Sequence, residues 1–145
     1  MSVISYLPLS LLVALSAWAC SGPDPLSGSY VLVAIEERDL PAPVPDTDYE
    51  VTKGSLNILD GSFAMSYAAN VRGTIWGSFT TVLKGSYDSH SGATIEFESA
   101  EQSINGSPPT DVDQAFIGTV QDDSLNLTLT DLNQVRWMFR RIDPL

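Results

Sequence analysis

The sequence predicts an all-β protein: an eight-stranded antiparallel up-and-down barrel that follows an N-terminal signal segment. Valine, isoleucine, threonine, phenylalanine and tyrosine recur in short runs, and glycine, aspartate, asparagine and proline separate these runs. No stretch keeps helical periodicity, and the 145 residues leave room for one domain. A meander of consecutive strands pairs all of its edge backbone groups only when it closes into a barrel, because closure removes exposed edges. A two-sheet β-sandwich is the alternative that the same strands permit.

The strand pattern begins at residue 28. Residues 28–36, GSYVLVAIE, form an almost continuous apolar run, which predicts a strand that is buried on both faces for part of its length. The segment 37–48 contains three prolines, so we expect it to be irregular and exposed. A strand at 49–59 follows, with a bulge expected at Gly54. Asp60-Gly61 is the strongest hairpin signal in the chain.

Two further strands are predicted in the middle of the chain. Large apolar and smaller residues alternate over 62–69, and 74–88 reads as one long strand that bends at Gly77 or Gly85. Within this long strand Trp76 is out of phase with the inward positions. We therefore expect its side chain to be exposed and available to a partner.

The last third of the chain predicts four strands, and the first of them covers 93–99. In that first strand isoleucine and phenylalanine point inward and two glutamates outward. The polar segment 100–113 contains two adjacent prolines and predicts a long loop. The three closing strands alternate apolar and polar residues and cover 114–121, 124–130 and 135–141.

The first residues have the features of an export signal. Residues 7–19 carry no charge, and about 13 residues suit the central part of a secretory signal (about 7–15) better than a membrane span (about 20). Ala17 and Ala19 are small residues at the spacing that a signal peptidase prefers, and Cys20 follows them. A buried hydrophobic N-terminal helix is the alternative to export.

The Ala-Cys-Ser sequence after this apolar run resembles the lipobox of bacterial lipoproteins, in which the cysteine after the cut is acylated. The resemblance implies a lipoprotein signal peptide at 1–19, a linker at 20–27 and a folded domain at 28–142. It also implies a membrane anchor through a lipid on Cys20 and a place in the bacterial cell envelope, at the outer membrane or the periplasmic face. A plain secreted protein cut at the same site is the alternative.

The folded part resembles the lipocalin-like (calycin) barrels, in particular small bacterial lipoproteins of that shape. Those begin the first strand with Gly-x-Trp and end the last with an aromatic residue and an arginine, which pack together at the barrel base. The matching positions are Gly28-Ser29-Tyr30 and Phe139 with Arg140 (or Arg141). The resemblance implies that Tyr30 and Arg140 close the base of a barrel able to hold a hydrophobic small molecule.

Aromatic residues recur at the inward positions of the predicted strands. They would line a ligand cavity or fill a solid core, and an eight-stranded barrel permits both. The candidate cavity residues are Tyr30, Phe63, Tyr67, Phe79, Phe97, Phe116, Trp137 and Phe139.

No constellation of residues predicts an enzyme. The single histidine, His90, lies in a turn, and the sequence lacks a nucleophile elbow, a phosphate-binding loop and a metal-binding histidine pair. Glu96 and Glu98 share the outward face of one strand, without the cleft that a glycosidase needs. Aspartates cluster where turns are expected, which turn chemistry explains, with a weak cation site as the alternative. We expect no catalytic residues, no metal and no cofactor.

Charge and cysteine content restrict the partners. The formal net charge of -11 repels the phosphates of nucleic acids, so we expect no nucleic-acid partner. The single cysteine cannot form a disulfide within the chain. Two hypotheses stay open: a barrel that binds a small hydrophobic or amphipathic ligand, and a packed barrel that contacts an envelope protein, for example as a protease inhibitor. An internal cavity distinguishes the first hypothesis from the second.

Overall fold

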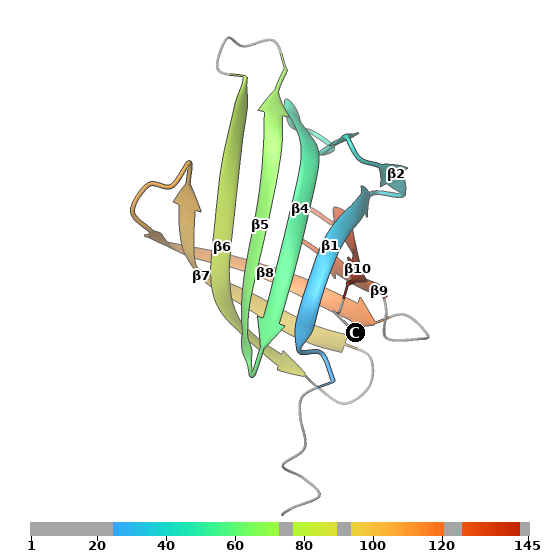
Figure 1. The fold of residues 1–145 in the computed structure, drawn as a ribbon, viewed down its shortest axis with the longest axis vertical. Coiled ribbons are helices and arrows are strands. Elements are labelled where there is room, and N and C mark those ends of the chain that lie inside the picture. The colour runs from blue at the N-terminus through green and yellow to red at the C-terminus, as the bar shows by residue number, and fades with distance from the viewer. Residues whose placement is uncertain (1–24, 73–76, 90–93, 121–125, 143–145) are drawn as a thin grey trace, which may run out of the picture.

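The computed structural model describes residues 25–72, 77–89, 94–120 and 126–142, which form an antiparallel barrel (Figure 1). Hydrogen-bonded neighbours follow the order β2-β1-β10-β9-β8-β7-β6-β5-β4-β3, and a further pairing of β1 with β4 closes the ring. The predicted eight-stranded up-and-down barrel is confirmed, and the sandwich alternative is wrong. The signal segment with Cys20, and the expectations for Trp76 and His90, lie outside the described residues.

Eight long strands form the ring, and two short ones lie in the connection between β1 and β4. Their bounds are β1 Gly28–Ile35, β2 Arg38–Asp39, β3 Ala42–Pro43, β4 Tyr49–Leu59, β5 Ser62–Val71, β6 Ser78–Ser89, β7 Thr94–Ile104, β8 Thr110–Val120, β9 Asn126–Thr130 and β10 Arg136–Arg141. All ten lie between residues 25 and 142, so this segment contains the complete hydrogen-bonded barrel. Nowhere in the described ranges is there a helix of the length and apolar character that crossing a bilayer requires.

Alternation of side chains fills the interior as the sequence predicts. In β7, Ile95 and Phe97 are buried while Glu96 and Glu98 are exposed. Trp137 and Phe139 are buried in the same way in β10, whereas in β9 Thr128 is buried together with Leu127 and Leu129 on either side of it. Successive strand residues point to opposite faces, so one apolar residue in two is enough to build a continuous core.

The Asp60-Gly61 hairpin is confirmed. Leu59 pairs with Ser62 across a two-residue connection, and both turn residues have positive φ, 46° and 87°. This backbone twist matches that of the flanking strands, and aspartate followed by glycine adopts it at little cost.

β1 joins the two ends of the sheet. Its residues Gly28–Val31 pair with β4, and from Tyr30 onward it pairs with β10. Beyond Val31 the strand leaves β4, and β2 and β3 pair with the parts of β1 and β4 that have separated. The barrel is therefore tight where β1 begins and wider where β1 ends.

Gly54 lies at this point of divergence, but the predicted bulge is elsewhere. The register of β4 against β5 shifts between Val51 and Lys53, whereas Gly54 pairs regularly with Tyr67. A Cβ atom at Gly54 would lie 2.9 Å from Cδ2 of Leu32. The glycine therefore makes room for Leu32 of the neighbouring strand instead of forming a bulge.

Two predicted loops are wrong. The segment 37–48 contains β2 and β3, and Ala42 is fully buried in the core. The segment 100–113 is largely strand, because β7 and β8 extend as a hairpin to Asn105-Gly106, whose φ angles are 53° and 72°. Most residues of this extension are exposed, so the sequence has no apolar alternation here that would predict a strand. Asn-Gly, however, is itself a hairpin signal.

The expected bend in the long strand β6 is at Gly85. The register between β6 and β7 shifts between Lys84 and Gly85. A Cβ atom on Gly85 would lie 1.9 Å from the carbonyl oxygen of Glu98, a backbone atom that cannot rotate away. Two backbones thus approach each other more closely here than any side chain permits.

Gly85→Ala should therefore destabilise the barrel by about 3 kcal/mol, because the added methyl group forces β6 and β7 apart. Urea denaturation measures the effect. Ser86→Ala is the matched control: Ser86 is exposed and should change the free energy of unfolding by less than about 0.5 kcal/mol. Equal effects of the two substitutions would contradict the close approach.

Candidate ligand-binding site

The end of the barrel at which β1 begins is closed by Tyr30 and Arg141. Tyr30 is 2% exposed, and its hydroxyl donates a hydrogen bond to the carbonyl of Leu26 at 2.9 Å. The guanidinium of Arg141 lies 5.8 Å from the centre of the Tyr30 ring. It also donates to the carbonyls of Pro25 and Ser27, at 2.8 and 2.6 Å. These contacts tie the residues before β1 to the end of β10.

The arginine of the closing pair is Arg141 and not Arg140. Phe139 points inward, and a strand alternates, so Arg141 shares the inner face while Arg140 is exposed. Arg141 is also the residue directly opposite Tyr30 in the β1–β10 register. The alternation of β10 was readable from the sequence and distinguishes the two arginines.

The interior next to this base is filled with aromatic rings. Phe63 and Phe97 meet edge to face at 5.2 Å between centroids, and Tyr87 packs on Phe97 at 5.5 Å. Phe139 is 1% exposed. Four of the candidate cavity residues, Tyr30, Phe63, Phe97 and Phe139, thus belong to the packed part of the core.

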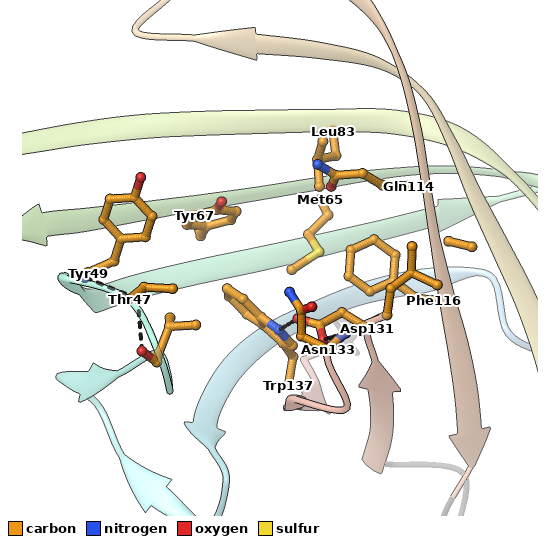
Figure 2. Close-up of a pocket in the computed structure, with 13 residues that line it drawn as sticks. Thr47, Tyr49, Met65, Tyr67, Leu83, Gln114, Phe116, Asp131, Asn133 and Trp137 are labelled. Carbon is orange, nitrogen blue, oxygen red and sulfur yellow. Dashed lines mark hydrogen bonds between the residues drawn. The ribbon is translucent and has the colours of Figure 1, made fainter.

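The opposite half of the barrel contains a cavity of about 400 Å³ (Figure 2). Three candidate residues, Tyr67, Phe116 and Trp137, line it, and Phe79 packs beside it against Tyr49 and Tyr67. The described lining consists of Val44, Thr47, Tyr49, Met65, Tyr67, Leu83, Gln114, Ala115, Phe116, Asp131, Leu132, Asn133 and Trp137.

The cavity wall is built around Tyr67 and Trp137. Their ring centroids are 5.1 Å apart and their planes are tilted by 52°. Tyr49 continues the aromatic surface through an edge contact of 5.1 Å with Phe79. At the mouth Leu132 is 71% exposed, so the apolar surface reaches the solvent. This lining suits a ligand with an apolar, ring-sized body.

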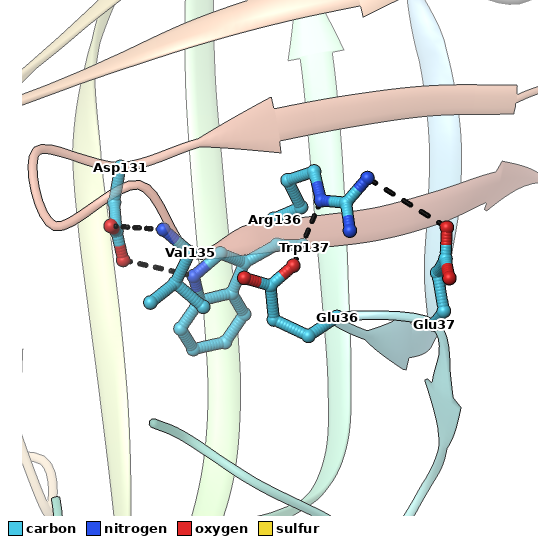
Figure 3. A network of polar contacts seen from close by, with 6 residues as sticks. All are labelled: Glu36, Glu37, Asp131, Val135, Arg136 and Trp137. Atoms are coloured by element: carbon cyan, nitrogen blue, oxygen red, sulfur yellow. Dashed lines mark hydrogen bonds and ion pairs between the residues drawn. The ribbon is translucent and has the colours of Figure 1, made fainter. Parts of the chain in front are cut away.

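Asp131 holds the mouth loop between β9 and β10 and orients the indole (Figure 3). Its Oδ1 accepts hydrogen bonds from the backbone amides of Asn133 and Val135, at 2.9 and 3.0 Å. Its Oδ2 accepts a hydrogen bond from Nε1 of Trp137 at 3.2 Å. The sequence indicated Asp131 only as a turn residue, and its contact with an inward tryptophan depends on how the hairpin closes.

Tyr67 and Asp131 are two of the polar groups that line the cavity. Burial raises the pKa of the Tyr67 phenol, a hydrogen bond with Thr81 opposes this effect, and the charges of Tyr49 and Asp131 also raise the pKa. The phenol therefore stays neutral near pH 7, while Asp131 contributes negative potential.

Arg136 is placed on the outside of the mouth. Its Nε donates to Glu36 at 2.8 Å, and its Nη1 lies 3.8 Å from Glu37 (Figure 3). The hydrogen bond with Glu36 and the nearby carboxylates raise the pKa of Arg136. The positive charge of this residue is thus engaged by the end of β1 and does not enter the cavity.

Other chemistry is not assembled in the described part of the chain. No three histidine, cysteine, aspartate or glutamate side chains among these residues are grouped as metal ligands. Glu96 and Glu98 lie on the outer wall, away from the cavity. Comparison of the chain with protein-family models, curated protein sequences and solved structures finds no match. Function is therefore inferred from the cavity itself.

Arg141→Met should lower the free energy of unfolding by about 1–3 kcal/mol, because two backbone carbonyls and the Tyr30 ring lose a charged partner. Arg140→Met removes the same charge from an exposed neighbour and should change stability by less than about 0.5 kcal/mol. Thermal and urea denaturation of both variants measure the difference. If Arg140→Met were the more damaging variant, the assignment of the closing pair would be wrong.

Proposed function

We propose that this protein is a non-enzymatic, lipocalin-like binding barrel for a small hydrophobic or amphipathic ligand, anchored to the bacterial cell envelope through a lipid on Cys20. The cavity carries the proposal. Its volume of about 400 Å³ falls within the range of small-molecule pockets, about 300–1,000 Å³. Its lining combines aromatic and aliphatic side chains with a few polar groups, as such pockets usually do.

The packed base supports a binding role over a purely structural one. A barrel that only presented its outer wall to a partner would gain stability from a filled interior throughout. Here rings pack against one another in both halves, but the half around Trp137 also contains a cavity that is open at one end. A cavity that is lined by aromatic and aliphatic side chains and opens at one end of the barrel supports a binding role.

The position of Cys20 suits an anchor that leaves the mouth free. Arg141 holds the carbonyl of Pro25 at the closed base, and Cys20 precedes Pro25 by five residues. Five residues extend over at most about 18 Å. A lipid on Cys20 would therefore keep the closed base near the membrane, and the cavity would open on the far side.

Binding can be tested with the neutral apolar fluorophore N-phenyl-1-naphthylamine and a chain of residues 21–145, which keeps every strand. We expect its emission to rise on binding, with saturation at one site. Asn133→Trp places an indole at the mouth and should weaken binding at least tenfold. Asn70→Trp makes the same substitution on the exposed face of β5 and should leave binding unchanged.

Saturable binding that Asn133→Trp weakens and Asn70→Trp does not would support the proposal. Absence of binding by the wild-type chain, or equal binding by both variants, would contradict a site in this cavity.

The anchor is tested separately in the full chain expressed in a bacterial host. Cys20→Ala removes the only thiol to which a lipid can be attached, so it should move the protein from the membrane fraction to the soluble fraction and abolish labelling by radioactive palmitate. Ser21→Ala is the neighbouring control and should stay in the membrane fraction. If Cys20→Ala remained as firmly in the membrane fraction as the control, the proposed lipid anchor would be refuted.

A further inference from the structure

We propose that the ligand of this cavity is an organic cation: a small amine with an apolar, ring-containing body, whose ammonium group pairs with Asp131. This inference rests on the proposed function, because it concerns the same cavity, and it adds the charge of the ligand. Three features of the described residues support it: the position of Asp131, the aromatic rings beside it and the charge around the mouth.

Asp131 is the one acidic side chain, and there is no basic one, among the described residues that line the cavity. Two backbone amides occupy its Oδ1, and Oδ2 accepts a single bond, the 3.2 Å contact with Trp137. A carboxylate offers about four acceptor positions, so Oδ2 retains capacity for a donor from a ligand. The nearby cation Arg136 is engaged by Glu36 and Glu37 on the outer face.

The aromatic wall next to Asp131 also favours a cation. The indole of Trp137 is held by Asp131 itself, and the ring of Tyr67 lies 5.1 Å from the indole (Figure 2). The face of an aromatic ring attracts a cation within about 6 Å, and tryptophan does so most strongly. An ammonium group beside Asp131 would thus lie next to a carboxylate and close to both rings.

The mouth carries negative charge, which disfavours anionic ligands. Residues 36–48, which connect β1 to β4 along the mouth, contain five acidic residues and one arginine, and with Arg136, which pairs with two of the acids, an excess of three negative charges remains. The whole chain has a formal net charge of -11. A field of this sign attracts cations and repels anions. A fatty acid would bring its own carboxylate towards Asp131 without a lining cation among the described residues to compensate.

Three ligands with the same indole body separate charge from shape: tryptamine is a cation at pH 7, tryptophol is neutral and indole-3-propionate is an anion. Isothermal titration of the chain of residues 21–145 should show tryptamine binding at least tenfold more tightly than tryptophol. Indole-3-propionate should bind most weakly. The preference for tryptamine should decrease as salt is raised from 20 to 500 mM, because the mouth charges are screened.

Asp131→Asn removes the charge and keeps an Oδ1 acceptor for the two backbone amides, but its Nδ2 replaces the Oδ2 that accepts from Trp137, and tryptophol binding measures that second effect. It should reduce the affinity for tryptamine about tenfold to a hundredfold, the usual effect of losing a hydrogen bond to a charged group, and change that for tryptophol much less. Should this variant fail to fold, Leu132→Lys and Leu132→Gln give the same test at an exposed position of the mouth. The lysine should weaken tryptamine binding at least fivefold more than the glutamine does, with equal effects on tryptophol.

The outcomes separate this inference from the proposed function. If tryptophol and N-phenyl-1-naphthylamine bind but tryptamine has no advantage, or Asp131→Asn and Leu132→Lys leave that advantage intact, the cationic ligand is refuted and the binding barrel stands. If neither the indoles nor the fluorophore binds, the binding barrel itself is refuted, and the inference with it.

Discussion

The pairing of β1 with both β4 and β10 is the constraint on which the rest of the structure depends. An antiparallel sheet of this length would otherwise expose two edges, each with unpaired backbone groups able to recruit another chain. β1 uses its first residues for β4 and most of its length for β10, so one strand satisfies both edges. The closed ring then buries one face of every long strand, and the apolar residues on these faces pack together in a single core.

The same strand explains why the two ends of the barrel differ. Near Gly28 it is hydrogen-bonded on both sides, and here Tyr30 stacks with Arg141 and the phenylalanines pack edge to face. Beyond Val31 it separates from β4, and the chain folds back through β2 and β3 at the widened end. The hollow half lies at the end where β1 leaves its neighbour. Its described lining comes from β4, β5, β6, β8 and β10 and from the connections before β4 and β10.

Local patterns predicted the ring well and the cavity poorly, for physical reasons. The burial alternation in β7 and β10 depends on neighbours in sequence, and so does the Asp60-Gly61 turn. The sequence therefore predicted these features. Phe97 and Tyr67 carry the same inward, aromatic signature, yet one is packed in the core and the other lines the cavity. What separates them is their height along the barrel axis, which is fixed only when distant strands close. The role of Asp131 was hidden for the same reason, since its partner Trp137 turns back towards it only within the folded hairpin.

Closure of the ring is tested most directly by amide hydrogen exchange, followed residue by residue with NMR. Tyr30 and Val31 pair with strands on both sides, so their amides should be protected to a degree similar to that of Leu83 in the centre of the sheet. The amides of Glu36 and Ile142, which donate across the β1–β10 seam at 3.0 and 2.8 Å, should also exchange more slowly than exposed turn amides. Exchange of Tyr30 and Val31 at the rate of an unprotected peptide, with Leu83 still protected, would show an open sheet and contradict the barrel from which the cavity follows.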